Sequence, residues 1–251
     1  MSDWQSAEAE STGSDGGSDQ ADEGNGQHPM KLGILADIHE HTEHLRQAIA
    51  VLHQHGADRY VVLGDVFEMG RRIQETVELL QQVQAVGVWG NHDVGLCLDP
   101  REAVCQRYSA AVRAFMGSLQ PRLEIDGCLF THLEPWLDPH KVEDLWYFDG
   151  PPDSPEKLAR SFAAVPHRVL FIGHLHRWLL GTPEGLLPWR GERPLHLDGG
   201  NRYLAVVHAV WHGQCALFDT TTGDLTPLAW QKTPDFLHHD QRRHSVDRTD
   251  S

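Results

Sequence analysis

Short apolar runs that stop abruptly at polar residues recur in the first third of this chain. Runs of this length predict buried strands. The runs cover residues 31–36, 59–63 and 87–89. The polar residues that follow them include Asp37 and His39, then Asp65, then Asn91, His92 and Asp93. Asp37 and His39 are two residues apart, so at the end of a strand they project to the same side.

The segments between these runs have helical spacing. Leu45, Ile49 and Leu52 recur at intervals typical of an amphipathic helix that ends at Gly56. A second helix is predicted over residues 71–85. The resulting βαβαβ order predicts a parallel sheet with its site at one edge, because ligands bind beyond the carboxyl ends of such strands.

The second part of the chain predicts one more long helix, over residues 101–119, and a shorter one over residues 155–164. The Asp126-Gly127 pair indicates a hairpin between strands 122–125 and 128–131, the second of which ends at His132. Residues 133–154 have the composition of a loop. A strand over residues 168–172 ends at His174 and His176. Further strands are expected over residues 194–198, 203–208, 214–219 and 225–230.

The 251-residue chain has a formal net charge of −15, and its charged residues are distributed unevenly along the sequence. Residues 1–29 hold seven acidic residues and no Lys or Arg, which predicts a disordered N-terminal tail and leaves −8 for the remainder. We expect one domain over residues 30–231 and a flexible polar tail over 232–251. Met30 directly precedes the first predicted strand and is therefore a second candidate start.

Composition also excludes several classes of protein. No basic stripe of the kind that binds duplex nucleic acid is present, and no apolar run reaches membrane-spanning length. The acidic start is unlike a secretory signal. Four cysteines stand at unrelated spacings, which indicates buried thiols in a cytoplasmic protein. The sequence leaves the oligomeric state open.

The residues at the strand ends suit metal binding. Imidazole, carboxylate and amide ligands without thiolate suit Mn, Fe or Zn. Seven ligands are too many for one ion but fit two ions that share a carboxylate, roughly 3.5–4 Å apart, as in sites that displace phosphoryl groups. The seven are drawn from the eight polar residues collected at the strand ends: Asp37, His39, Asp65, Asn91, His92, His132, His174 and His176.

The ordered motifs Asp-x-His, Gly-Asp, Gly-Asn-His-Asp, His and Gly-His-x-His resemble the calcineurin-like metallophosphoesterase superfamily over roughly residues 30–230. The resemblance implies an α/β fold: a four-layer α/β/β/α sandwich of two mixed sheets flanked by helices. It implies Asp37, His39 and His176 on one metal, Asn91, His132 and His174 on the other, and Asp65 as the bridge. The implied reaction is in-line attack by a metal-bridging hydroxide.

The resemblance also implies roles beyond metal binding. His92 would contact phosphate and protonate the leaving group, Asp93 would orient His92, and Asn91 would also contact the substrate. Arg71 and Arg72 are further candidates for phosphate contact. For the ligand at His132, His140 is the rival, but His140 lies in a proline-bounded loop rather than at a strand end. His41, two residues after His39, is expected to start the helix rather than to reach the substrate.

Substrate class is the most open question. The stretch Gly64 to Gly70 lacks the Asp-Arg pair of the phosphatase motif Gly-Asp-x-x-Asp-Arg-Gly, and the chain is short. Both features favour a phosphodiesterase on a small phosphoester; a phosphomonoesterase, including a protein Ser/Thr phosphatase, and a non-catalytic scaffold are the alternatives. The aromatic residues Trp136 and 146–148 could stack on a nucleobase or aryl group, or pack a long loop.

Overall fold

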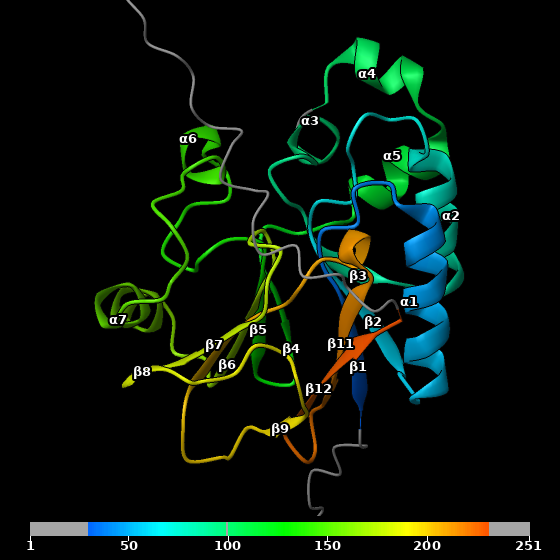
Figure 1. The fold of residues 1–251 in the computed structure, drawn as a ribbon. Coiled ribbons are helices and arrows are strands. Elements are labelled where there is room, and N and C mark those ends of the chain that lie inside the picture. Colours follow the sequence, from blue (N-terminus) through cyan, green and yellow to red (C-terminus); the bar gives the residue numbers. More distant parts are fainter. Residues whose placement is uncertain (1–29, 99, 231–251) are drawn as a thin grey trace, which may run out of the picture.

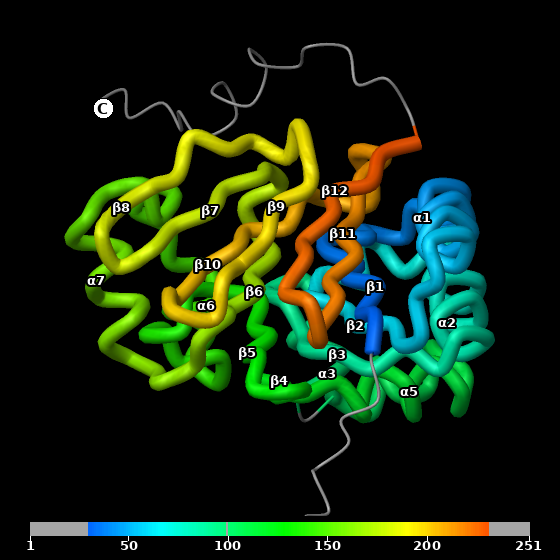
Figure 2. The backbone as a smooth tube through the Cα atoms, turned by 90° about the horizontal axis from the view of Figure 1, so that it is seen from below, coloured from blue at the N-terminus to red at the C-terminus, as the bar shows by residue number. Residues whose placement is uncertain are grey.

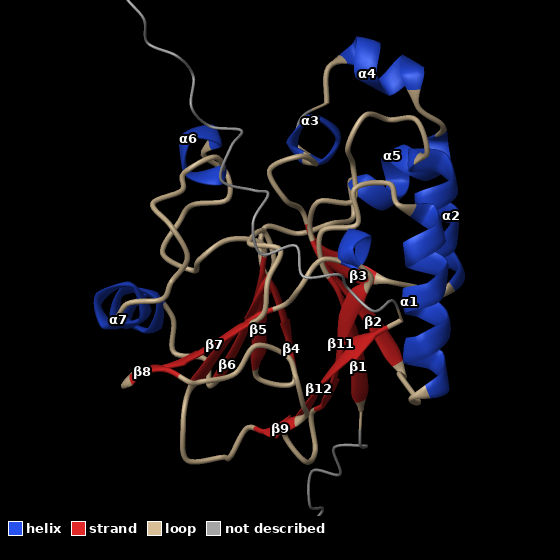
Figure 3. Cartoon of the chain, in the orientation of Figure 1, coloured by secondary structure: helices blue, strands red, loops and turns tan. Residues whose placement is uncertain are grey.

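A computed structural model of the protein describes residues 30–98 and 100–230. The predicted tails over residues 1–29 and 232–251 lie outside this range. The described residues form two six-stranded sheets that pack face to face and are flanked by helices (Figures 1 and 3). This is the four-layer α/β/β/α arrangement of two mixed sheets that the sequence motifs imply.

The first sheet has the strand order β3-β2-β1-β11-β12-β9. Strands β1, β2 and β3 run parallel to one another, whereas β11 is antiparallel to β1. The predicted parallel unit is therefore one half of a mixed sheet. Its strands are β1 (Lys31–Leu35), β2 (Arg59–Leu63), β3 (Val86–Val88), β9 (Leu195–His196), β11 (Gln214–Asp219) and β12 (Asp224–Ala229).

The second sheet has the order β4-β5-β6-β10-β7-β8. Strands β5, β6 and β10 are parallel neighbours, and β4 pairs with β5 through the predicted Asp126-Gly127 hairpin. Its strands are β4 (Leu123–Ile125), β5 (Cys128–Thr131), β6 (Val169–Ile172), β7 (Leu179–Thr182), β8 (Gly185–Leu186) and β10 (Tyr203–Val206).

Helices cover the outer faces of both sheets. Helices α1, α2 and α5 lie along the first sheet and α7 along the second (Figure 2). The helices are α1 (Thr42–Gln54), α2 (Ile73–Gln82), α3 (Val94–Cys97), α4 (Glu102–Arg107), α5 (Ala110–Met116), α6 (Val142–Leu145), α7 (Pro155–Ala164) and the 3-10 helix η1 (Val210–His212). No helix within the described ranges combines the length and apolar character that a membrane span requires.

Side chains alternate between the two faces of a strand, and this alternation explains which apolar cluster each residue of β1 joins. Leu32 and Ile34 of β1 point into the cluster between the sheets, whereas Leu35 joins the cluster beneath α1 and α2. The inter-sheet cluster contains stacked Phe130 and Phe171, whose ring centroids are 5.2 Å apart. Since both faces of the central strands are covered, the strands read as continuous apolar runs in the sequence.

The prediction of one helix over residues 101–119 was wrong. The chain forms α4 and α5 with a break between them, because Tyr108 is extended and Ser109 caps the second helix. The Ser109 side chain accepts a hydrogen bond from Val112 N and donates one to Gln74 Oε1. A capping serine therefore outweighed the helical spacing of the apolar residues.

Several shorter elements were not predicted. Helix α3 follows Asp93, helix α6 lies inside the predicted loop over 133–154, and β7 and β8 follow His176. Gly181 weakens the strand pattern of β7, and a side chain there would meet Leu158 of α7. The four cysteines are free thiols, but the prediction that all are buried was wrong, since Cys97 and Cys105 are half-buried.

Candidate metal centre

The carboxyl ends of strands from both sheets meet at one place. In the first sheet β1, β2 and β3 are parallel, and in the second β5 and β6 are parallel, so each set ends on one side. The loops are joined by backbone hydrogen bonds from Asp37 N to Gly64 O and from Gly173 N to His132 O. The loops after β1, β2, β3, β5 and β6 therefore lie at the same end of the two sheets (Figure 1), and their polar residues are brought together.

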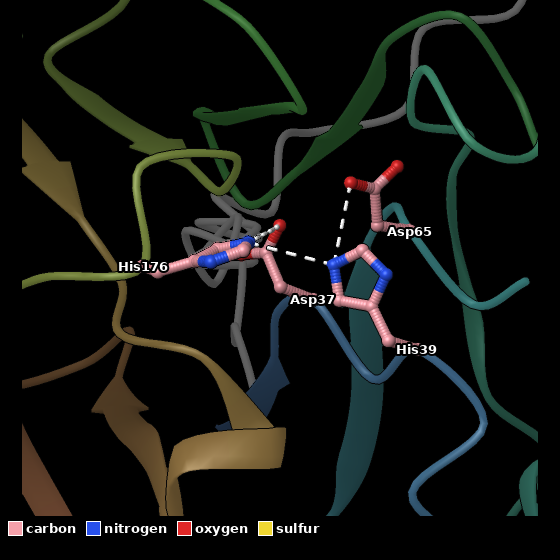
Figure 4. Close-up of side chains that lie close together, drawn as sticks. All are labelled: Asp37, His39, Asp65 and His176. Carbon is pink, nitrogen blue, oxygen red and sulfur yellow. Dashed lines mark hydrogen bonds and ion pairs between the residues drawn. The ribbon is translucent and has the colours of Figure 1, made fainter. Parts of the chain in front are cut away.

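One half of this cluster contains Asp37, His39, Asp65 and His176 (Figure 4). The Nε2 atom of His176 lies 3.3 Å from Asp37 Oδ1 and 3.4 Å from His39 Nε2. His39 Nε2 lies 3.6 Å from Asp65 Oδ2. The four candidate ligand atoms all lie within 4.8 Å of one another, which is compact enough for a single cation.

The other half contains Asp65, Asn91, His132 and His174. His132 Nε2 lies 3.4 Å from Asp65 Oδ2 and 2.9 Å from Asn91 Oδ1. The same Asn91 oxygen lies 3.1 Å from His174 Nδ1. The structure therefore brings all seven predicted ligands into two adjoining groups.

A single oxygen of Asp65 faces both halves. Its Oδ2 atom is the one close to His39 and also the one close to His132. The other oxygen, Oδ1, accepts a hydrogen bond of 3.0 Å from His92 N, which fixes the carboxylate in this orientation. Asp65 is buried, so few water molecules compete for it.

The donor set fits a cation. His132 Nδ1 lies 2.7 Å from Leu63 O, and a carbonyl oxygen only accepts, so Nδ1 carries the hydrogen and Nε2 presents a lone pair. That lone pair faces the oxygens of Asn91 and Asp65, and acceptors that face one another need a proton or a cation between them. Imidazole, carboxylate and amide ligands suit divalent metals.

A family comparison supports the same conclusion. Residues 30–207 match the model of the calcineurin-like phosphoesterase superfamily domain. The chain belongs to this superfamily. The superfamily is one of metal-dependent phosphoesterases, so the chain is a hydrolase of that kind. Its clustered His and Asp residues are able to hold a divalent metal ion.

Two further proteins are similar to this phosphoesterase. A protein of Methanocaldococcus jannaschii, MJ0912, which is described as uncharacterized, is 24% identical over 196 residues, or 69% of this chain and 73% of its own. A metallophosphoesterase from Sphaerobacter thermophilus has the same fold with a TM-score of 0.65 at 21% identity. That similarity covers 81% of this chain and 89% of the other.

The backbone of the phosphoesterase site is strained. Positive φ angles are uncommon outside glycine. The site residues with such angles are Asp37, His39, Glu40, Asp65, His174 and His176, with φ between 46° and 66°. Left-handed residues directly after the strands turn the ligand side chains inward, and such strain persists only where the surrounding packing holds it.

Two glycines allow the loops to approach one another. Gly64 has φ of 87°, and a Cβ there would collide with His132 Nδ1 and with the backbone of Gly90. A Cβ at Gly90 would in turn collide with the Asp65 carboxylate. The glycine before Asp65 and the glycine before Asn91 are therefore required by the spacing of the ligands.

Electrostatics in the site centre on His132 and Asp65. Burial disfavours the charged form of both groups, but their mutual attraction is stronger, so the pKa of His132 rises to about 9 and that of Asp65 falls. Burial and then the charge of His132 lower the pKa of His174 to about 4. A cation bound between His132 and Asp65 replaces the proton that they otherwise hold.

The prediction that Asp93 orients His92 is corrected by the structure. Asp93 is fully buried and accepts hydrogen bonds from the backbone N–H groups of Val66, Phe67 and Gly90, so it stabilises the loops instead. Burial and then the Asp65 charge raise the pKa of Asp93 to about 7. The orienting position beside His92 belongs to another carboxylate.

Glu68 takes that position. Its Oε2 lies 3.2 Å from His92 Nδ1 and 2.9 Å from His39 Nδ1, so one carboxylate orients two imidazoles. Glu68 was not predicted from the sequence, although it stands three residues after Asp65, where the phosphatase motif has its second Asp. Its side chain is 43% exposed and that of His92 31%, so this side of the site is open.

Other predicted residues are placed as follows. His140 packs against Trp89, with ring centroids 5.6 Å apart, whereas His132 lies beside Asp65; that His132 rather than His140 is the ligand stays a prediction. His41 precedes α1 and its ring lies 5.7 Å from that of Trp211. Arg71 is exposed before α2, and its role as a phosphate contact stays a prediction. Arg72 donates a hydrogen bond to Thr42 Oγ1.

Proposed function

We propose that this phosphoesterase is a binuclear metal-dependent phosphodiesterase that hydrolyses a small phosphodiester by in-line attack of hydroxide. The observation that supports two ions is the position of Asp65 Oδ2 between two sets of nitrogen ligands. Asp37, His39 and His176 would hold one ion, and Asn91, His132 and His174 the other. Asp65 would be shared.

The chain's own residues have clear tasks in this reaction. When bound, two divalent cations lower the pKa of water and neutralise charge on the phosphate. His92 is held by Glu68 through Nδ1, so its Nε2 is free to donate a proton to the leaving oxygen. The exposed side of His92 is the side from which substrate enters.

A diester suits the site better than a monoester. A phosphate diester has one negative charge, whereas a monoester has close to two at neutral pH. The phosphatase-type Asp-Arg pair is missing, and the Arg72 guanidinium is already bonded to Thr42. Fewer cationic groups near the metals favour the ligand of lower charge.

The compartment and the metals are part of the proposal. Four free thiols without a disulfide in the described chain suit the reducing cytoplasm, where we place the enzyme. Manganese, iron and zinc all accept this mixture of imidazole and carboxylate ligands. Elemental analysis of the purified protein identifies the metals and their number.

Hydrolysis of two nitrophenyl esters tests the proposed activity. With Mn²⁺ the enzyme should cleave bis-p-nitrophenyl phosphate faster than p-nitrophenyl phosphate. The reverse ranking would favour the alternative, a phosphomonoesterase or protein Ser/Thr phosphatase. Failure to cleave either ester with Mn, Fe or Zn would favour a non-catalytic scaffold.

Replacement of the shared carboxylate tests the binuclear site. Asp65→Asn should lower both metal content and turnover, because the amide carries no charge for the two cations to share. Asp224→Asn is the matched control, since Asp224 lies exposed on β12 and pairs with His196. Unchanged turnover in Asp65→Asn would remove Asp65 from its bridging role.

A further inference from the structure

The exposed large hydrophobic side chains of the described chain come from two segments beside the metal centre. These side chains are Met69, Val142, Trp146, Tyr147 and Phe148, with exposed fractions between 42% and 61%. Met69 directly follows Glu68, and the other four lie in and after α6. Contiguous exposed apolar groups on a protein surface mark binding sites more often than isolated ones do.

Two of these aromatic rings contact histidines of the site. The Trp146 ring centroid lies 5.4 Å from that of His92, and the Phe148 centroid lies 6.5 Å from that of His174. Trp146 is 57% exposed and Phe148 61% exposed despite these contacts. More than half of each side chain therefore remains exposed next to the open side of the centre. We call Trp146 and Phe148 the aromatic wall.

The intervening Tyr147 anchors the wall. Its ring packs edge-to-face on Trp136 at 5.5 Å, and the Arg160 guanidinium lies 3.5 Å from the Trp136 ring on α7's side. The Tyr147 hydroxyl donates to Asp149 Oδ2, and Lys157 Nζ donates to Asp149 O. These contacts hold the segment that carries Trp146 and Phe148, so little ordering is needed when a ligand binds.

The charge around the wall limits what can bind there. Glu143 and Asp144 in α6 are acidic, whereas Asp149 just beyond the wall pairs with Lys157 and Arg160 of α7. Acidic neighbours repel duplex nucleic acid and anionic lipid surfaces. An uncharged aromatic ring meets no such repulsion, and it gains stacking energy on exposed aromatic side chains.

We propose that the aromatic wall binds an aromatic ring on the leaving-group side of the phosphoester, so that the substrates are diesters of nucleosides or of aryl alcohols. The inference rests on the proposed function, because it assumes that phosphate binds at the metals beside His92. His92 protonates the leaving oxygen, and Trp146 is the side chain in contact with His92 on the exposed side. A ring a few bonds beyond that oxygen lies against Trp146.

Equilibrium binding of three phosphate monoesters, two of which carry an aromatic group on the ester oxygen, tests the proposal. The ligands are AMP, phenyl phosphate and ribose 5-phosphate, titrated calorimetrically into Mn²⁺-loaded protein. The two aromatic ligands should bind about tenfold more tightly than ribose 5-phosphate, as expected for one base-aromatic stack. A preference for AMP over phenyl phosphate identifies a nucleobase as the ring, and equal affinity identifies a simple aryl group.

Variants of the wall provide the decisive comparison. Trp146→Ala should remove most of the aromatic advantage, Phe148→Ala part of it, and Trp146→Phe should retain it. Val142→Ala, an exposed apolar change in α6 outside the wall, should leave all three affinities unchanged. Equal affinities for the three ligands in the wild type, or an aromatic advantage that survives Trp146→Ala, would overturn the proposal.

Two controls separate this result from other outcomes. If the wall were instead an interface between copies of the chain, Trp146→Ala would reduce the mass seen by sedimentation and leave the ligand ranking unchanged, which also overturns the proposal. Thermal melts show whether each variant is folded. Equal affinities for the three ligands in a wild type that still shows metal-dependent hydrolysis would refute the wall alone. Absence of hydrolysis in the wild type would refute the proposed function.

Discussion

Hydrogen bonds outside the ligand set decide which nitrogen each imidazole offers. His132 gives its Nδ1 hydrogen to Leu63 O, and His39 faces Glu68 through Nδ1. Both therefore present Nε2 to the centre. Partners of this kind fix the tautomer and the ring orientation of metal ligands, and their loss typically weakens the site 10–100-fold.

His92 should matter most when the leaving group is poor. His92→Ala should slow hydrolysis of an alkyl diester by about 100-fold, but hydrolysis of a nitrophenyl diester much less, because nitrophenolate leaves without a proton. Glu68→Gln should also slow the alkyl diester more than the nitrophenyl diester, but by a smaller factor, because glutamine keeps a hydrogen-bond acceptor beside His92 and lacks only the charge. Steady-state kinetics on both esters measure the effect. An equal loss on both esters would mean that His92 binds phosphate rather than donating a proton.

His208 should make the protein sensitive to acid. Burial, and then neighbouring His212, lower the pKa of His208 to about 3, whereas an unfolded histidine titrates near 6.5. Above pH 6.5 His208 is neutral in both the folded and the unfolded protein, so it does not lower the free energy of unfolding. Between pH 6.5 and 3 only the unfolded state takes up the proton, so the free energy of unfolding falls as the pH falls.

The variant His208→Asn isolates this effect. The amide oxygen can replace Nδ1 as the acceptor for Ala209 N, and the amide does not titrate. Relative to this variant, the wild type should lose about 2 kcal/mol between pH 7.5 and pH 5. Urea unfolding at both pH values measures the difference. The exposed His53→Asn serves as control, and parallel pH profiles for wild type and His208→Asn would contradict the assignment.

At the scale of elements, the loops after the strands hold one another in place. The Glu40 carboxylate, after β1, accepts hydrogen bonds from the backbone N–H groups of Glu68, Gly70 and Arg72, after β2. Glu40 is 7% exposed and has a φ of 57°. One buried carboxylate thereby fixes the loop that carries Glu68, which in turn orients His92.

Glu40→Gln should loosen this loop. A glutamine keeps one acceptor oxygen but places an NH₂ group where Arg72 N–H donates, so we expect a loss of about 1–3 kcal/mol of unfolding free energy. Hydrogen exchange at the amides of residues 68, 70 and 72 should become faster. Glu43→Gln, an exposed change in the first turn of α1, should stay within about 0.5 kcal/mol of wild type. Unaltered hydrogen exchange in Glu40→Gln would show that the loop over residues 68–72 is stable without the Glu40 carboxylate.

At the scale of the whole molecule, the metal centre joins the two sheets. The first sheet supplies Asp37, His39, Asp65 and Asn91 from its loops, and the second supplies His132, His174 and His176. Each half of the centre contains ligands from both sheets. A cation bound in either half therefore links the sheets beyond their apolar contact.

Metal binding should accordingly stabilise the fold. At about 100 times its dissociation constant a ligand specific for the folded state adds about 2.7 kcal/mol, or roughly 5–10 °C in Tm for a domain of this size. Mn²⁺ should produce this rise and a chelator should reverse it. The rise should be mostly lost in Asp65→Asn and kept in Asp224→Asn. A rise of equal size in Asp65→Asn would place the stabilising ion elsewhere.

The local pattern of apolar and polar residues was sufficient to predict the strands that lead to the site. The strands that lead to Asp37, Asp65, His132 and His174 were predicted because both their faces are buried and their ends are polar, which is visible in the sequence. The order of the motifs indicated the superfamily and the four layers. Strand β7 was missed because Gly181 weakens its apolar pattern. Helices α4 and α5 were merged into one because the cap at Ser109 does not interrupt the helical spacing of the apolar residues.

The sequence by itself determined which residues stand at the strand ends and which metal chemistry they suit, because a buried strand and a polar end are local properties. Only the tertiary structure decided that Glu68 rather than Asp93 faces His92, that Glu40 holds the loop of Glu68, and that Trp146 lies beside the centre. Those relations join residues distant in the chain, and in the sequence each of them resembles an ordinary surface residue. Their roles arise only when two sheets pack and bring separate loops to one edge.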